Sequence, residues 1–120
     1  MTPICEVVIT GPTASWLAEF TRQLVSDRLA ACGQNIGSIR SIYRWQGTIE
    51  DEGEARVALH TRIGLVSRIV ERANEQHPYD VPCVIAIPVI AGNDAYIRWV
   101  LDETIESTDA TPNGLVPPDA

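Results

Sequence analysis

The chain has 120 residues, of which 45% are hydrophobic and 21% are charged, and this composition is typical of a single globular domain. Its net charge of −7 comes from 16 acidic and nine basic residues, a balance that argues against nucleic acid as a partner. The sequence offers no run apolar enough to span a membrane and no secretory signal at its start. We therefore expect a cytoplasmic protein without a membrane partner.

The first two predicted elements are a strand over residues 4–10 and a helix that Thr13 can cap. Alternation along the strand places Cys5, Val7 and Ile9 on one face. The spacing of the apolar residues Leu17, Phe20, Leu24 and Ala31 carries the predicted helix to Gly33. Cys32 is then expected at the end of this helix. Its ordinary interpretation is a small apolar residue that fills the join between the helix and the sheet.

The next stretch predicts a hairpin whose first strand covers residues 37–45. A polar turn region follows over residues 46–53, and the chain returns as a strand over residues 54–63. In the returning strand, alternation places Ala55, Val57, Leu59 and Thr61 inward and His60 on the opposite face.

A helix over residues 65–76 is followed by a polar loop over residues 77–82, which contains histidine, tyrosine and two prolines. An apolar strand over residues 83–87 comes next. Prolines at both ends of this strand predict a sheet edge, and its unbroken apolar run predicts burial on both faces. Such an edge needs a partner chain to cover it. Asn93 or Asp94 can cap a last helix, and residues 107–120 are predicted to form a flexible tail.

The order β-α-β-β-α-β-α predicts an α+β domain over residues 1–106, a ferredoxin-like split βαβ sandwich with an added C-terminal helix. In this topology the first and last strands are neighbours, so Cys5 and Cys83 are expected to approach each other. Three widely spaced cysteines indicate reduced thiols rather than a disulfide framework. Apolar residues on the open sheet face favour self-association.

Candidate metal ligands are the three cysteines together with His60 and His77, and thiolate with imidazole suits copper or zinc. Their spacing does not force them together, so we expect no obligatory cofactor. His77, which precedes Pro78, can equally serve as a hydrogen-bonding loop residue. No phosphate loop, GxSxG elbow or HExxH motif is found, so an enzyme is not expected. Several side chains could line a cleft: Tyr43, Trp45, Tyr79, Asp80 and Trp99.

The sequence resembles the CutA divalent-cation tolerance proteins. The resemblance rests on Leu29-Ala30-Ala31-Cys32, Ser41-Ile42-Tyr43-Arg44-Trp45-Gln46-Gly47, His77-Pro78-Tyr79-Asp80-Val81-Pro82, and Gly92-Asn93 with Tyr96 and Trp99. It implies a tight homotrimer with a PII-like architecture and clefts between subunits. Cys32 and His77 match a cysteine and a histidine of the family's motifs, whereas His60 stands where the family usually has lysine.

From the residues and the resemblance we expect a homotrimer that contributes to metal tolerance and binds copper or zinc through Cys32 or His77. One alternative is a PII-like sensor with a small ligand in an inter-subunit cleft, lined by Tyr43, Trp45, His60, Tyr79, Asp80 and Trp99. Another alternative is a purely structural trimeric scaffold.

Overall fold

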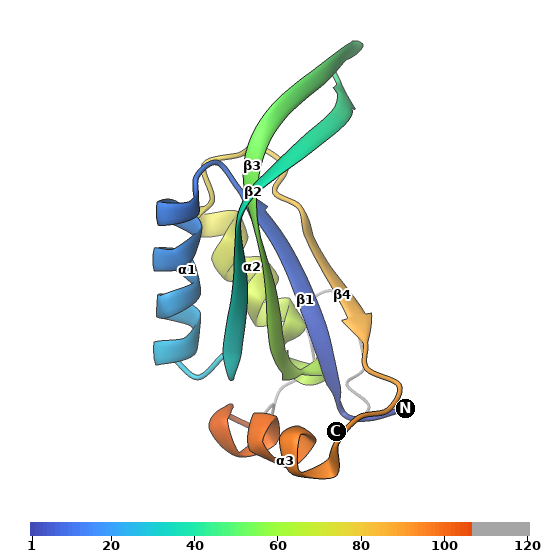
Figure 1. Ribbon diagram of the computed structural model, residues 1–120. Helices are drawn as coiled ribbons and strands as arrows, with labels where there is room; N and C mark the ends of the chain where they lie inside the picture. Colours follow the sequence, from blue (N-terminus) through green and yellow to red (C-terminus); the bar gives the residue numbers. More distant parts are fainter. Residues whose placement is uncertain (107–120) are drawn as a thin grey trace.

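The computed structural model of the chain describes residues 1–106, whose elements follow the expected order β-α-β-β-α-β-α (Figure 1). The strands are β1 (Ile4–Gly11), β2 (Cys32–Trp45), β3 (Thr48–Arg62) and β4 (Val84–Pro88). The helices are α1 (Ala14–Ser26), α2 (Val66–Gln76) and α3 (Asp94–Glu103), and a 3-10 turn at Ile63–Leu65 precedes α2. The predicted tail lies outside the described residues.

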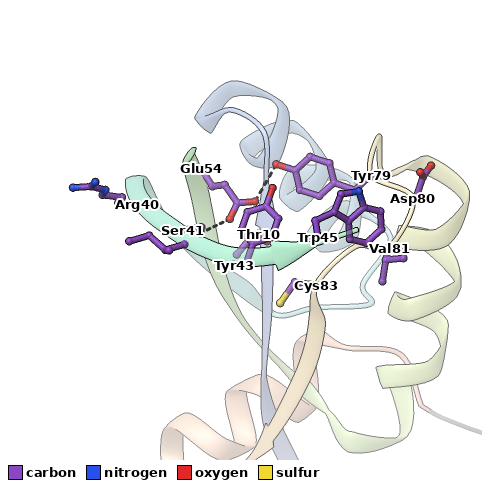
Figure 2. Close-up of a pocket in the computed structure, with 11 residues that line it drawn as sticks. Thr10, Arg40, Ser41, Tyr43, Trp45, Glu54, Tyr79, Asp80, Val81 and Cys83 are labelled. Atoms are coloured by element: carbon purple, nitrogen blue, oxygen red, sulfur yellow. Dashed lines mark hydrogen bonds between the residues drawn. The ribbon is translucent and has the colours of Figure 1, made fainter. Parts of the chain in front are cut away.

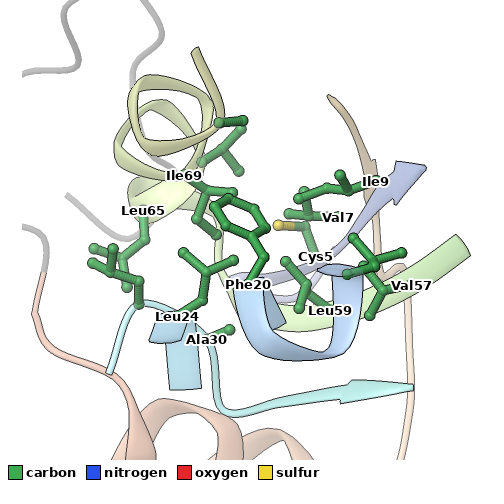
Figure 3. Packing of buried hydrophobic residues seen from close by; sticks show 14 of the residues in the cluster. Cys5, Val7, Ile9, Phe20, Leu24, Ala30, Val57, Leu59, Leu65 and Ile69 are labelled. Carbon is green, nitrogen blue, oxygen red and sulfur yellow. The ribbon is translucent and has the colours of Figure 1, made fainter. Parts of the chain in front are cut away.

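The strands form one antiparallel sheet in the order β2-β3-β1-β4, which confirms the ferredoxin-like α+β fold. Helices α1 and α2 cover one face of this sheet, and the hairpin of β2 and β3 extends beyond them (Figure 1). The main core lies between these two layers (Figure 3). It includes Cys5, Val7, Ile9, Leu17, Phe20, Leu24, Val57, Leu59, Leu65 and Ile69.

Helix α3 lies at one end of the opposite, open face of the sheet (Figure 1). Val100 packs there with Ile4 and Ala31 in a second, smaller cluster. The Asn93 side chain caps α3 by accepting a hydrogen bond from the Ala95 backbone N–H at 2.9 Å, as predicted. The open face is therefore covered at the α3 end, while the hairpin end is left to solvent.

The prediction that the first helix reaches Gly33 is wrong, because α1 ends at Ser26. Arg28 has a left-handed φ of 62°, and the Leu29 N–H bonds back to the Leu24 carbonyl at 2.9 Å, so the chain leaves the helix there. The following apolar residues Leu29, Ala30 and Ala31 are buried although they are not helical. Apolar spacing does not distinguish such a stretch from another helical turn. Cys32 is therefore the first residue of β2.

The predicted turn region over residues 46–53 is also wrong, because the two strands continue until Trp45 pairs with Thr48. Only Gln46 and Gly47 form the turn, and both have positive φ, at 49° and 82°. A two-residue turn of this kind matches the twist of the paired strands. The acidic residues that follow belong to β3, where they face β2.

Strand β4 lies at the sheet edge as predicted, but within one chain it is not buried on both faces. Ile85 is 53% exposed and Ile87 is 45% exposed. The expected approach of Cys5 and Cys83 is also not observed. Cys5 pairs with Pro88 at one end of β4, whereas Cys83 precedes the other end.

Candidate functional site

Three polar side chains form one row across the open face of the sheet. His60 on β3 is paired with Cys32 on β2 and also with Glu6 on β1. Directly paired residues of antiparallel strands point to the same face, so the register brings these three together. Cys32 Sγ lies 3.5 Å from His60 Nδ1, and His60 Nε2 lies 3.1 Å from Glu6 Oε1.

Helix α3 adds Tyr96 to this row, and we call the four residues the thiol-imidazole cluster. The Tyr96 hydroxyl lies 2.5 Å from His60 Nδ1 and 3.3 Å from Cys32 Sγ. The Tyr96 ring also stacks on Trp99, with a centroid distance of 5.7 Å. Burial, the hydrogen bond with Cys32 and the charge of Glu6 raise the pKa of Tyr96 to about 12. Tyr96 is therefore a neutral phenol near pH 7.

Glu6 determines which nitrogen of His60 carries the proton. An ionised carboxylate can only accept, so His60 Nε2 donates its proton to Glu6 Oε1. In neutral His60, Nδ1 is then left as an acceptor, and it faces the Cys32 thiol and the Tyr96 hydroxyl. The His60 side chain is 15% exposed and that of Glu6 is 35% exposed, so solvent reaches this edge of the cluster.

His77 has a different environment at the end of α2, where only 8% of it is exposed. Its Nδ1 accepts the Tyr79 backbone N–H at 3.1 Å, and its Nε2 donates to the Thr10 carbonyl at 2.7 Å. Trp16 packs edge-on against the His77 ring at a centroid distance of 4.7 Å. His77 Nε2 therefore holds the loop after α2 against the end of β1, while Nδ1 bonds within the loop.

A cleft of 760 Å³ opens between the hairpin and the loop that precedes β4 (Figure 2). We call it the loop cleft. Its lining is formed by Thr10, Arg40, Ser41, Ile42, Tyr43, Trp45, Glu54, Tyr79, Asp80, Val81 and Cys83.

Glu54 is the central acceptor of the loop cleft (Figure 2). It accepts hydrogen bonds from the Ser41 hydroxyl at 2.5 Å and from the Tyr79 hydroxyl at 3.0 Å. Burial and the bond to Glu54 raise the pKa of Tyr79 well above its usual range. Tyr43 donates to Glu52, and this bond, with some burial and nearby carboxylates, raises the pKa of Tyr43 to about 12. The acidic residues of the hairpin thus serve as cross-strand acceptors.

The structure divides the residues predicted for one cleft. Tyr43, Trp45, Tyr79 and Asp80 line the loop cleft, whereas His60 belongs to the thiol-imidazole cluster and Trp99 stacks beside it. Sequence reasoning did not identify Glu6 and Tyr96 as site residues. Glu6 alternates with Cys5 and Val7 along β1 and so lies on the open face, but its pairing with His60 depends on the sheet register.

The two candidate metal ligands are also separated. Cys32 lies in the row of Glu6, while His77 contacts Thr10, four residues further along β1. At roughly 3.3 Å per residue this separation is about 13 Å along the strand. Within residues 1–106, no three His, Cys, Asp or Glu side chains converge to form a metal site by themselves.

Comparison with known proteins gives a family for this fold. The family model described as CutA1 divalent ion tolerance protein matches residues 5–103. A "Divalent-cation tolerance protein CutA" from Thermus thermophilus is 35% identical over 98 residues, which cover 82% of this chain and 95% of that protein. A mouse "Protein CutA" is 41% identical over 92 residues, which cover 77% of this chain and 52% of the relative. The chain therefore spans about half the length of the animal relative.

Solved structures lead to the same family. The crystal structure of CutA1 from Oryza sativa has a TM-score of 0.85 and 33% identity, and the match covers 88% of this chain and 97% of that one. A periplasmic divalent cation tolerance protein CutA from Archaeoglobus fulgidus has a TM-score of 0.81 and 26% identity, and the match covers 83% of this chain and 97% of that one. Among residues 1–106, no helix is long and apolar enough to cross a membrane.

Proposed function

Because the chain belongs to the CutA1 divalent ion tolerance protein family, we propose that it acts in metal tolerance as a homotrimer that binds copper or zinc directly. The observation that carries this proposal is the pairing of the Cys32 thiol with the His60 imidazole on the open face of the sheet. Thiolate and imidazole are ligands that copper and zinc prefer. A reducing compartment such as the cytoplasm keeps this thiol available.

Exposed apolar side chains support the proposed trimer. Ile85 and Ile87 on the edge strand β4 are about half exposed, and Ile42 on the protruding hairpin is 63% exposed. An apolar edge strand is a template for pairing with another chain, so a stable protein needs to cover it. Self-association covers these residues without requiring a second protein.

Cys32 and His77 contribute to this proposal in different ways. Cys32 can bind an ion with little rearrangement, because it is partly exposed beside His60. His77 would first have to release the Thr10 carbonyl or the Tyr79 N–H, at a cost of about 1 kcal/mol for each hydrogen bond. We therefore propose Cys32 as the primary ligand, and we propose no catalytic role for the chain.

Calorimetric titration of copper and zinc into the reduced protein tests this function, with the oligomer mass measured in the same buffer. We expect saturable binding to a trimer, lost in Cys32→Ser and retained in His77→Ala if the latter still folds. A trimer that binds neither ion would contradict direct metal binding.

The loop cleft favours a second candidate function, which is binding of a small ligand by a PII-like sensor. Its volume of 760 Å³ lies in the range of small-molecule sites, which is roughly 300–1,000 Å³, and its wall combines Trp45 and Val81 with the acceptor Glu54. A thermal-shift series against a panel of metabolites tests this candidate. Stabilisation by a metabolite and by no metal would favour the sensor over the metal-tolerance proposal.

A further inference from the structure

We propose that Cys32 Sγ and His60 Nδ1 are the two protein ligands of a zinc-class ion, and that Glu6 is the carboxylate that orients His60. This inference rests on the proposed function, because it names the site at which the cation binds. It selects His60 from the candidate metal ligands of the sequence, whose spacing along the chain did not bring any two of them together. It also leaves His77 as the residue that holds the loop after α2.

The separation of the two donor atoms fits such an ion. A tetrahedral zinc ion with a Zn–S distance of about 2.3 Å and a Zn–N distance of about 2.05 Å places sulfur and nitrogen roughly 3.6 Å apart. The distance between Cys32 Sγ and His60 Nδ1 is 3.5 Å. The pairing of β2 with β3 therefore places the two donor atoms at the spacing that the ion requires.

Glu6 prepares His60 for this role. Metal-bound histidines usually donate their second ring N–H to a carboxylate or carbonyl, which fixes the tautomer and raises the basicity of the ligand nitrogen. The bond from His60 Nε2 to Glu6 Oε1 at 3.1 Å supplies this contact and leaves the electron pair of Nδ1 facing Cys32. The three side chains come from three adjacent strands, so the sheet holds their arrangement.

The other groups at the site fit weak, exchangeable binding. No third Cys, His, Asp or Glu within residues 1–106 completes the coordination, so water would occupy the remaining positions. The Tyr96 hydroxyl contacts both donor atoms and competes with an incoming ion for them. On binding, Cys32 releases its thiol proton to solvent and coordinates the ion as thiolate. The Tyr96 hydroxyl then moves aside.

Two other candidate ligands in the described part of the chain, Cys83 and His77, are less suited to the same ion. Cys83 is exposed and lines the loop cleft, away from the row that contains His60. His77 is buried, with both ring nitrogens bonded to backbone groups. These differences make Cys83→Ser a matched control for Cys32→Ser, because each variant removes one thiol outside the main core.

The test uses Co²⁺ as a spectroscopic probe, titrated into the reduced, chelator-treated full chain and then displaced with Zn²⁺. Direct coordination by sulfur produces a thiolate-to-cobalt charge-transfer absorption, which a hydrogen-bond network alone does not produce. We expect this absorption in the wild type and in Cys83→Ser. It should disappear in Cys32→Ser and in His60→Gln. Circular dichroism and oligomer mass confirm that each variant is folded.

Two further variants test the roles of the neighbouring residues. Glu6→Gln should weaken Co²⁺ and Zn²⁺ affinity by roughly 10- to 100-fold while the charge-transfer absorption remains at saturation. Tyr96→Phe should bind at least as tightly as the wild type, because it removes the competing hydroxyl. A tenfold loss of affinity in Tyr96→Phe would overturn the assignment of Tyr96 as a competitor.

The outcomes separate this inference from the broader function. Metal binding that persists unchanged in folded Cys32→Ser or His60→Gln would overturn the proposed ligands and leave metal tolerance standing. Failure of the wild-type trimer to bind cobalt, zinc or copper would overturn both proposals.

Discussion

At the scale of single residues, the two histidines show how the environment decides the role of one side chain. His60 bonds to Glu6 through one nitrogen and presents the other to a thiol and a phenol. His77 uses both nitrogens on backbone groups and is packed against Trp16. His60 is therefore suited to binding a ligand, whereas His77 is suited to holding a loop.

The three tyrosines provide a prediction at the residue scale. The fold raises the pKa of Tyr79 and Tyr96 above the ordinary value of 10, mainly through burial, and that of Tyr43 mainly through its bond to Glu52. A group whose pKa is higher in the folded state than in the unfolded state contributes to the stability of the fold. This contribution is complete below the unfolded-state pKa and is lost as the pH rises through the folded-state pKa. We therefore expect the free energy of unfolding to fall above about pH 10.

Denaturant unfolding at a series of alkaline pH values measures this effect, together with tyrosinate absorbance of the folded protein. Tyr79→Phe is the comparison variant, because it removes the group with the largest upward shift. Its free energy of unfolding should fall less steeply with pH than that of the wild type. Equal slopes would contradict the role assigned to Tyr79.

At the scale of elements, β2 connects the two candidate sites. Cys32 at its start belongs to the thiol-imidazole cluster, and Tyr43 and Trp45 at its end line the loop cleft. A register shift between Ile36 and Ile39 interrupts the pairing of β2 with β3. Such an irregularity bends a strand, and here it separates the part that packs on α1 from the protruding hairpin.

Gly33 gives a prediction at the element scale, because β2 passes close to α1 there. A Cβ added at Gly33 would lie 2.3 Å from the Thr21 methyl and 3.0 Å from a Leu59 methyl. We expect Gly33→Ala to destabilise the fold by about 1–3 kcal/mol through overpacking. Chemical denaturation at a fixed protein concentration measures the change.

Gly37→Ala is the matched control in the same strand, because a Cβ there meets nothing within 4 Å. Its free energy of unfolding should remain within about 0.5 kcal/mol of the wild type. Equal stability of the two variants would show that Gly33 is not held tightly between the sheet and α1.

At the scale of the whole molecule, the open sheet face has two unlike ends. At the α3 end, Val100 and Ile4 are buried, and the polar row beside them is partly enclosed. At the hairpin end and along β4, large apolar side chains remain exposed in one chain. This division agrees with the proposed trimer, in which subunits contact each other through β4 and the hairpin.

The trimer gives the prediction at this scale. Ile85→Arg places a charge on the exposed strand β4, where burial by another subunit would leave it without solvation. We expect this variant to sediment as a smaller species than the wild type. Ile90→Arg changes an isoleucine that lies beyond the end of β4, outside the strand that the proposed contact uses, so it should keep the wild-type mass. An unchanged mass for Ile85→Arg would show that β4 does not carry the subunit contact.

The local pattern of the sequence was sufficient to predict the order of the elements and the topology, but not the end of α1 or the length of the hairpin strands. Alternation placed Val7, Ile9 and Leu59 on the buried face, and Thr13 was recognised as a cap. Asn93 was one of two predicted candidates for the cap of the last helix, with Asp94 as the other. These features depend on neighbours a few residues apart, so they can be read along the chain. The motifs that indicated the CutA family are likewise continuous stretches.

The thiol-imidazole cluster depended on the tertiary structure. Cys32, His60 and Glu6 come together only because three strands pair in one particular register, and no spacing along the chain specifies that register. The misplaced end of α1 concealed the strand position of Cys32. The order of the elements followed from local patterns and the family from continuous motifs, whereas the site required the long-range pairing of strands that are far apart in sequence.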